Sequence, residues 1–294
     1  MSAAAGSEDF LAGMAASSAA RCARARQLRS EVQLREFISR LPPPPALRLS
    51  AEGFDLIAEL KLRSPAVGQL RAAASEDVPG RVMEYAEAGA AAVSVLTEPS
   101  RFDGSMLHLE KAGRALALRQ VPAMRKDFLV DPYQVLEARA AGAGGVLVIL
   151  RMLPRAALEA LVAEALEQQL FVLLEAFDEA DIALAGELLA SHGARAARNA
   201  LLVGVNCRDL VSLQVVPGRL EALASKLPVE APRVAESGVA SAQDAARVAA
   251  AGYDLALVGS ALMAGGEPRA LAAAMIDAGR AAHGRRARRA AARP

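Results

Sequence analysis

The sequence predicts an α/β fold, a closed (β/α)8 TIM barrel preceded by an extra N-terminal helical segment. From Phe54 onward, short apolar runs alternate with amphipathic helical patterns, which gives eight β-α units. Parallel strands need crossovers of about a dozen residues, and eight such units fit a closed barrel of roughly 250 residues better than an open sheet. No Gly-x-Gly-x-x-Gly opens any of these helices, which argues against a dinucleotide-binding sheet.

Residues 1–53 are the predicted N-terminal helical extension. A ragged helical pattern rich in Ala and Arg runs from Phe10 to Arg40, and the prolines from Pro42 to Pro45 cannot continue it. We expect this segment to lie against the main domain. Its arginines are expected to form a solvated face rather than a binding site. They are Arg21, Arg24, Arg26 and Arg29.

The barrel domain is predicted to span residues 54–282, and residues 283–294 are predicted to be a basic, disordered tail. Helical patterns between the strands include Pro132–Ala141 and Arg155–Gln168, and the last helix is expected from Pro268 to about Ala282. The predicted strands are Phe54–Lys61, Ala91–Leu96, Val121–Lys126, Gly145–Leu150, Leu170–Glu175, Leu201–Asn206, Arg233–Glu236 and Leu255–Gly259.

Composition limits the possible partners. A net charge of +1, the absence of Trp and only 3% aromatic residues argue against a nucleic-acid partner. No run approaches the roughly 18 apolar residues of a membrane helix, and the first residues lack the pattern of a signal peptide. Cys22 and Cys207 fit no zinc or iron–sulfur spacing, so we expect reduced thiols, no metal site and a cytoplasmic protein. The expected partner is a small molecule.

Polar residues end most of the predicted strands. Because side chains alternate between the faces of a strand, Glu59 and Lys61 share one face at the end of the first. Strand ends of a parallel barrel meet at one mouth, where barrel enzymes carry their chemistry. A lone Glu-x-Lys is more simply a surface ion pair, but six of eight strand ends carry such groups, which favours an active site. They are Glu59-Leu60-Lys61, Arg125-Lys126-Asp127, Glu175, Asn206-Cys207-Arg208, Glu236-Ser237-Gly238 and Gly259-Ser260.

These strand ends suggest two kinds of chemistry. Ser237-Gly238 and Gly259-Ser260 place small residues on the seventh and eighth strands, where barrel loops bind phosphate through backbone N–H groups. The charged residues could supply an acid and a base, or a lysine among them could form a Schiff base, and the spacing does not decide between these. The charged set is Glu59, Lys61, Lys126, Glu175 and Glu236.

At this point the chain resembles a specific family, indole-3-glycerol-phosphate synthase of tryptophan biosynthesis. The resembling segments occur in the family's order between about residues 54 and 265. They are IAELKLRSP (57–65), AVSVLTEPSRFDGS (92–105), RKDFLVDPYQVLEARAAGA (125–143), LLEAFDE (173–179), GVNCRDL (204–210), AESGV (235–239) and LVGSALM (257–263). The resemblance implies a carboxy-lyase that closes, decarboxylates and dehydrates 1-(2-carboxyphenylamino)-1-deoxyribulose 5-phosphate, with no metal or organic cofactor.

The resemblance also implies roles for individual residues. Lys126 resembles the general acid that protonates the substrate's ketone oxygen, and Lys61 the lysine that neutralises substrate charge and assists ring closure and dehydration. Glu175 matches the glutamate of the dehydration step. Residues that hold the glycerol hydroxyls and tune the lysines are Glu59, Asn206 and Glu236. Residues expected to bind the substrate are Ser64, Phe102, Arg208, Ser237, Gly238, Gly259 and Ser260.

Three departures from the family pattern put substrate affinity in question more than reaction type. Ala66-Val67 replaces a Ser and a basic residue in the loop after the first strand, Cys207 replaces a polar residue, and Ser191–Ala200 resembles an insertion. Two hypotheses remain, an active synthase and a phosphate-binding paralogue that has lost or changed this activity. Retention of both lysines and all three glutamates favours the first. A monomer, with at most weak contacts to other tryptophan-pathway enzymes, is expected.

Overall fold

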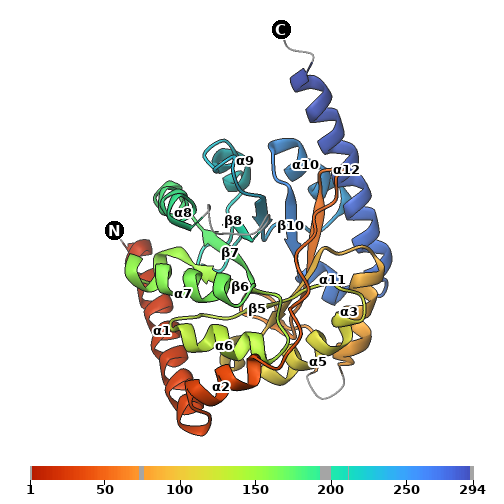
Figure 1. Ribbon diagram of the computed structural model, residues 1–294. Helices are drawn as coiled ribbons and strands as arrows, with labels where there is room; N and C mark the ends of the chain where they lie inside the picture. The colour runs from red at the N-terminus through yellow and green to blue at the C-terminus, as the bar shows by residue number, and fades with distance from the viewer. Residues whose placement is uncertain (1, 73–75, 193–199, 211, 292–294) are drawn as a thin grey trace.

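The computed structural model describes residues 2–72, 76–192, 200–210 and 212–291. Eight parallel strands close into a barrel in the order β1-β10-β9-β8-β7-β6-β5-β4, with helices around it (Figure 1). The predicted fold class and its eight strands are therefore confirmed. The strands are β1 (Asp55–Leu60), β4 (Ala92–Leu96), β5 (Ala123–Lys126), β6 (Gly145–Ile149), β7 (Phe171–Ala176), β8 (Leu201–Asn206), β9 (Arg233–Glu236) and β10 (Leu255–Val258).

Helices connect the strands as the periodicity predicts. The expected insertion at Ser191–Ala200 falls mainly on residues 193–199, which lie outside the described residues. The helices are α1 (Ser2–Leu28), α2 (Glu31–Ile38), α3 (Val78–Glu87), α4 (Pro99–Phe102), α5 (Met106–Ala117), α6 (Pro132–Ala140), the 3-10 helix η1 (Leu150–Met152), α7 (Arg155–Glu167), α8 (Glu179–His192), α9 (Arg219–Ala224), α10 (Ala242–Ala251), α11 (Ser260–Ala264) and α12 (Pro268–Ala291).

A short antiparallel pair after β1 was not predicted. It consists of β2 (Arg63–Ser64) and β3 (Gly68–Gln69), joined by a tight turn. Gly68 has a φ of 85°, a conformation that glycine adopts without steric cost. The strands are too short for a period-two pattern, so only the turn residues signalled them.

Alternate strand residues fill the inside of the barrel. Ile57, Leu173, Leu202 and Leu257 belong to one buried apolar cluster, whereas Val203 belongs to a separate cluster that includes the surrounding helices. Nearer the carboxyl ends the inward positions become charged, because the same alternation brings in the acidic and basic residues of the strand ends. The apolar layers thus form a closed floor below a polar mouth.

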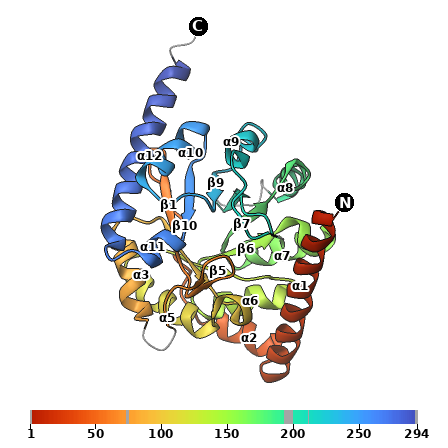
Figure 2. The same cartoon turned by 180° about the vertical axis from the view of Figure 1, so that it is seen from behind.

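The N-terminal extension forms two helices where one ragged stretch was expected. Ser30 accepts a hydrogen bond from the Gln33 backbone N–H, and the Gln33 side chain accepts one from the Ser30 N–H. This capping box begins a new helix at Glu31, which accounts for the break. In both views α1 lies beside α6 and α7 (Figures 1 and 2).

The prediction that the extension's arginines form a solvated face is wrong for two of them. Arg21 donates two hydrogen bonds to the buried carboxylate of Asp127, at 2.9 and 2.7 Å. Arg26 pairs with Asp131 at 2.7 Å. The carboxylates lie immediately after β5 and just before α6, so these ion pairs fasten α1 to the loop that follows Lys126.

Replacing Asp127 by Asn should lower the free energy of unfolding by on the order of 2 kcal/mol near neutral pH. Burial alone would raise the pKa of Asp127, but hydrogen bonds from Arg21 and the charge of Arg125 lower it to about 2. A carboxyl whose pKa is lower in the folded state stabilises above its unfolded pKa, and this contribution disappears as pH falls from about 4 towards 2. Urea unfolding across this pH range measures the effect.

The control for this variant is Asp131→Asn, which alters a more exposed pair and should cost less than about 1 kcal/mol. Equal losses for both variants, or a loss from Asp127→Asn that does not shrink in acid, would contradict the stabilising role of the buried pair.

The last helix corrects the prediction of a disordered tail. Although α12 was expected to end near Ala282, it continues to Ala291 and projects beyond the barrel (Figures 1 and 2). Ala and Arg are strong helix formers, and Gly284 alone does not end the helix. Arg280 donates to the Phe54 carbonyl and to Asp55, which fixes α12 at the start of β1. Among the helices that the structure describes, none has the length and apolarity to cross a membrane.

Candidate active site

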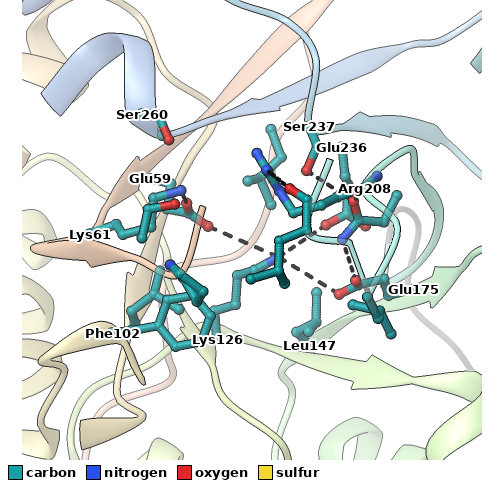
Figure 3. Close-up of a pocket in the computed structure, with 18 of the residues that line it drawn as sticks. Glu59, Lys61, Phe102, Lys126, Leu147, Glu175, Arg208, Glu236, Ser237 and Ser260 are labelled. Carbon is teal, nitrogen blue, oxygen red and sulfur yellow. Dashed lines mark hydrogen bonds and ion pairs between the residues drawn. The ribbon is translucent and has the colours of Figure 1, made fainter. Parts of the chain in front are cut away.

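A cavity of about 310 Å³ opens at the carboxyl ends of the barrel strands. Every residue predicted for the site lines it, including the candidates for phosphate binding. Figure 3 shows the charged residues among them, gathered around Lys126. The structure therefore brings together side chains from β1, β5, β7, β8 and β9 and from the loops beyond them. The predicted residues are Glu59, Lys61, Ser64, Phe102, Lys126, Glu175, Asn206, Arg208, Glu236, Ser237, Gly238, Gly259 and Ser260.

Lys126 lies at the centre of the charged groups. Its Nζ lies 3.1 Å from Glu236 Oε2, 3.7 Å from Glu175 Oε2 and 4.0 Å from Glu59 Oε2 (Figure 3). Burial disfavours its charged form, but the three carboxylates outweigh burial and raise the pKa of Lys126. In the free protein this ammonium is thus fully protonated and available as a proton donor.

Lys61 and Glu59 form a second pair on β1 and its end. Lys61 Nζ lies 2.9 Å from Glu59 Oε1, which confirms that the two side chains share a face. Burial alone would raise the pKa of Glu59, but the charges of Lys61 and Lys126 lower it. Glu59 is therefore an ionised carboxylate between the two lysines.

Glu236 differs from Glu59 in its protonation. Burial disfavours its ionised form, repulsion from Glu175 and Glu59 acts in the same direction, and the attraction of Lys126 only partly offsets them. The pKa of Glu236 is raised to about 8. The site thus holds the neutral carboxyl of Glu236 and the ionised carboxylate of Glu59 at neutral pH, an arrangement typical of sites that carry out proton transfer.

Asn206 connects three neighbouring strands at the mouth. Its Nδ2 donates to Glu175 Oε1 at 2.7 Å, and its Oδ1 accepts from Ser237 Oγ at 2.9 Å and from the Arg208 backbone N–H at 3.0 Å. These bonds hold the carboxylate of β7 and the turn after β9 in fixed positions relative to β8.

Small residues follow both β9 and β10: Ser237-Gly238 form a turn after β9, whereas Gly259 caps and Ser260 begins α11 after β10. Ser237 and Gly238 have φ values of 65° and 70°, the left-handed region in which Ser carries a steric cost. The buried Cys207 thiol donates to the Ser237 carbonyl at 3.3 Å, which supports this turn from below. Since α10 begins only at Ala242, behind its own cap Ser241, the turn itself and not that helix end lines the cavity.

Aromatic and apolar residues of the cavity escaped the sequence analysis. Phe128 lies 6.1 Å from Phe10 and 6.4 Å from Phe102, measured between ring centroids. Phe10 comes from α1, so the extension contributes a wall of the site. Phe128 follows Lys126-Asp127 directly, and this proximity was the available signal, whereas nothing local connects Phe10 with the barrel mouth.

The loop with Ala66-Val67 lies beside the cavity. Ser64 and Pro65 line it, while Val67 is 64% exposed. The departure from the family pattern thus leaves an exposed apolar side chain on this loop.

The family model and the relatives that this chain matches carry the same name. Residues 12–275 match the family model described as Indole-3-glycerol phosphate synthase. The indole-3-glycerol phosphate synthase of Parafrankia sp. (strain EAN1pec) is 41% identical over 248 residues, which cover 84% of this chain and 87% of that protein. The enzyme of the same name from Mycobacterium leprae (strain TN) is 37% identical over 253 residues, which cover 85% and 86%.

Solved structures support the fold at lower identity. The 3-hexulose-6-phosphate synthase of Salmonella typhimurium has a TM-score of 0.57 at 15% identity, over 79% of this chain and 99% of that one. Thiamine phosphate pyrophosphorylase of Pyrococcus furiosus has a TM-score of 0.53 at 16% identity, over 79% and 99%. These likenesses concern the barrel alone. With the family match over most of its length and relatives at this identity, the chain belongs to the indole-3-glycerol phosphate synthase family.

Proposed function

We propose that this protein is an active indole-3-glycerol-phosphate synthase. It converts 1-(2-carboxyphenylamino)-1-deoxyribulose 5-phosphate to indole-3-glycerol phosphate, carbon dioxide and water in tryptophan biosynthesis. The observation that carries the proposal is Lys126, an ammonium within 4.0 Å of three carboxylates in a cavity that is also lined by Ser237-Gly238 and Gly259-Ser260. A binding-only paralogue would have no need for this cluster of acidic and basic groups.

In the proposed mechanism, Lys126 gives a proton to the ketone oxygen of the substrate as the ring carbon attacks the carbonyl carbon. The new carbon–carbon bond leaves a cationic intermediate. This intermediate accepts the electron pair of the bond between the ring and the carboxylate, and carbon dioxide is released. Lys61 then assists departure of the hydroxyl as water, and Glu175 accepts the proton lost from the ring system. Lys61 also neutralises the substrate carboxylate during binding.

Substrate binding is assigned to groups around this cluster. The phosphate is assigned to the turn of Ser237-Gly238 and to Gly259-Ser260 at the start of α11, both of which line the cavity with small residues. Phe102, with Phe128 beside it, provides an apolar surface for the aromatic ring. Glu59, Asn206 and Glu236 are assigned to the hydroxyl groups, and Ser64 and Arg208 to the remaining polar contacts.

The assay for this function is fluorescence of the indole product after purified protein is mixed with the substrate. An active synthase produces it catalytically, in amounts that exceed the enzyme concentration. A protein that binds the substrate with no product, measured by calorimetry alongside, would be the retooled paralogue instead.

The pH profile of kcat/KM should show an alkaline limb near pH 8 that belongs to Glu236. Its pKa of about 8 means that the carboxyl is neutral below this pH and ionised above it. The added negative charge repels an anionic substrate, so kcat/KM should fall as pH rises past 8. In Glu236→Gln the residual activity should lack this limb.

Glu230→Gln is the matched control for this profile. Glu230 is exposed and precedes β9, at the end of the strand opposite to Glu236. It should leave the limb in place. Persistence of the limb in Glu236→Gln would assign it to another group.

We further propose that the protein acts as a cytoplasmic monomer with a small-molecule partner. Cys22 and Cys207 are both unbridged, as reduced thiols would be. Contacts with other enzymes of the pathway are expected to be weak, and a single mass in light scattering at working concentration tests the monomer.

A further inference from the structure

Gly204 leaves a space on the inner wall of the barrel. It lies on β8, aligned with Glu175 of β7 and Val234 of β9. Two residues away on either side, Leu202 belongs to the interior cluster and Asn206 lines the cavity, so position 204 also faces inward. Such a position in a barrel usually carries a bulky branched side chain. Gly204 has no side chain, so β8 leaves this position of the barrel wall open.

The carboxyl group of Glu236 fills that space. A Cβ atom on Gly204 would lie 2.2 Å from Glu236 Oε1 and 3.0 Å from Leu173 Cδ1. The first distance is far inside van der Waals contact, so any larger residue must displace Glu236. Gly204 is not among the glycines with positive φ, hence its backbone does not require glycine. The position requires a residue without a side chain, because the Glu236 carboxyl occupies the space that a side chain would fill.

The two oxygens of Glu236 have different surroundings. Oε2 accepts a hydrogen bond from Lys126 Nζ at 3.1 Å. Oε1, the atom above Gly204, is buried and has no hydrogen-bond partner within the described residues. Glu236 is only 1% exposed, and the charged groups that face it are Lys126 on β5, Glu175 on β7 and Glu59 on β1. Its burial, which keeps the carboxyl neutral at pH 7, depends on the space at Gly204.

We propose that Gly204 is a positioning residue for the synthase reaction, because its missing side chain lets the Glu236 carboxyl lie within the barrel wall in contact with Lys126. This inference rests on the proposed function. Gly204 acts through Glu236 and does not itself contact the substrate. A methyl group at this position pushes Glu236 towards the mouth, where it is better solvated and no longer holds Lys126.

Gly204→Ala tests the proposal directly. We expect kcat to fall about tenfold, while KM changes less than about threefold, since misplaced catalytic groups lower the rate more than they weaken binding. Carbon-13 NMR of the Glu carboxyl groups should show Glu236 titrating at lower pH than in the parent, its signal being assigned by its absence in Glu236→Gln. The control is Gly186→Ala on α8, where a Cβ meets nothing within 4 Å.

A shorter carboxylate should make the methyl group harmless. In the Glu236→Asp background, adding Gly204→Ala should lower kcat by less than about twofold, because Asp does not reach the space that the methyl fills. An equal penalty in both backgrounds overturns the proposal. If Gly204→Ala alone fails to fold, folding of the double variant supports it. Failure of both assigns the crowding to Leu173 and overturns it.

The titration also separates this inference from the proposed function. A parent protein without synthase activity refutes the function, yet a shifted Glu236 titration in Gly204→Ala still supports the positioning of Glu236. An active parent whose Glu236 titration and kcat are both unchanged by the methyl group refutes the inference alone.

Discussion

Lys126→Met should lower kcat by at least about a hundredfold while KM changes far less, because a positioned acid contributes roughly 10² to 10⁴ in rate. Lys126 is 17% exposed in its side chain and lies against Glu236, Glu175 and Glu59. Methionine preserves most of the volume but cannot donate a proton. The carboxylates that lose their counter-charge can bind protons instead, so the barrel should still fold. Single-turnover rates and substrate affinity, measured together, check this result.

Lys111→Met provides the matched control, since Lys111 is exposed on α5. It should leave both constants unchanged. A kcat for Lys126→Met within tenfold of the parent would transfer the role of the acid to Lys61, which lies 2.9 Å from Glu59 on the other side of the cluster.

The fold was predictable because its signals are local. Alternation along a strand decides which residues face inward, so Glu59 and Lys61 could be assigned to one face before any strand order was known. Eight repeats of this pattern leave little choice of architecture. The sequence signals were weakest for very short elements such as β2 and β3. They were also ambiguous in the C-terminal tail, whose Ala and Arg residues are compatible with both a disordered segment and a helix.

The site residues at the strand ends were predictable from local patterns, and Ser64 and Phe102 from the family resemblance, but the contribution of α1 was not. A strand end fixes where a side chain begins, but contacts between α1 and the barrel join residues more than 100 positions apart, as in Arg21 and Asp127. A pattern of neighbouring residues carries no information on contacts over such a separation in sequence. For the same reason, the position of Phe10 in the cavity wall was not predicted.

Protonation was also beyond the sequence. Burial and the like charge of Lys61 lower the pKa of Lys126 and nearby carboxylates raise it, so the sequence alone left the net direction open. The structure places three carboxylates within 4.0 Å of Lys126 Nζ, and they raise its pKa. Such a balance depends on distances of a few ångströms between strands that are not neighbours, which a sequence does not specify.

Gly238→Asp should raise the KM for the phosphorylated substrate by at least about tenfold, equivalent to roughly 1.4 kcal/mol of lost binding. The turn after β9 is narrow, because a Cβ atom at this position would lie 2.9 Å from Cys207 Sγ and 3.2 Å from Val215 Cγ1. Its φ of 70° disfavours any side chain. Aspartate adds a negative charge where the phosphate is proposed to bind, and this electrostatic repulsion is the largest of the three effects.

Gly238→Asn separates charge from shape, since Asn has the same size as Asp, tolerates the left-handed conformation and is neutral. It should raise KM clearly less than Gly238→Asp. Gly218→Asp, at a second glycine of positive φ with open space around it, controls for a charged residue in a strained turn and should leave KM unchanged. Equal KM values for the Asp and Asn variants would make the effect steric, and an unchanged KM in folded Gly238→Asp would remove the phosphate from this turn.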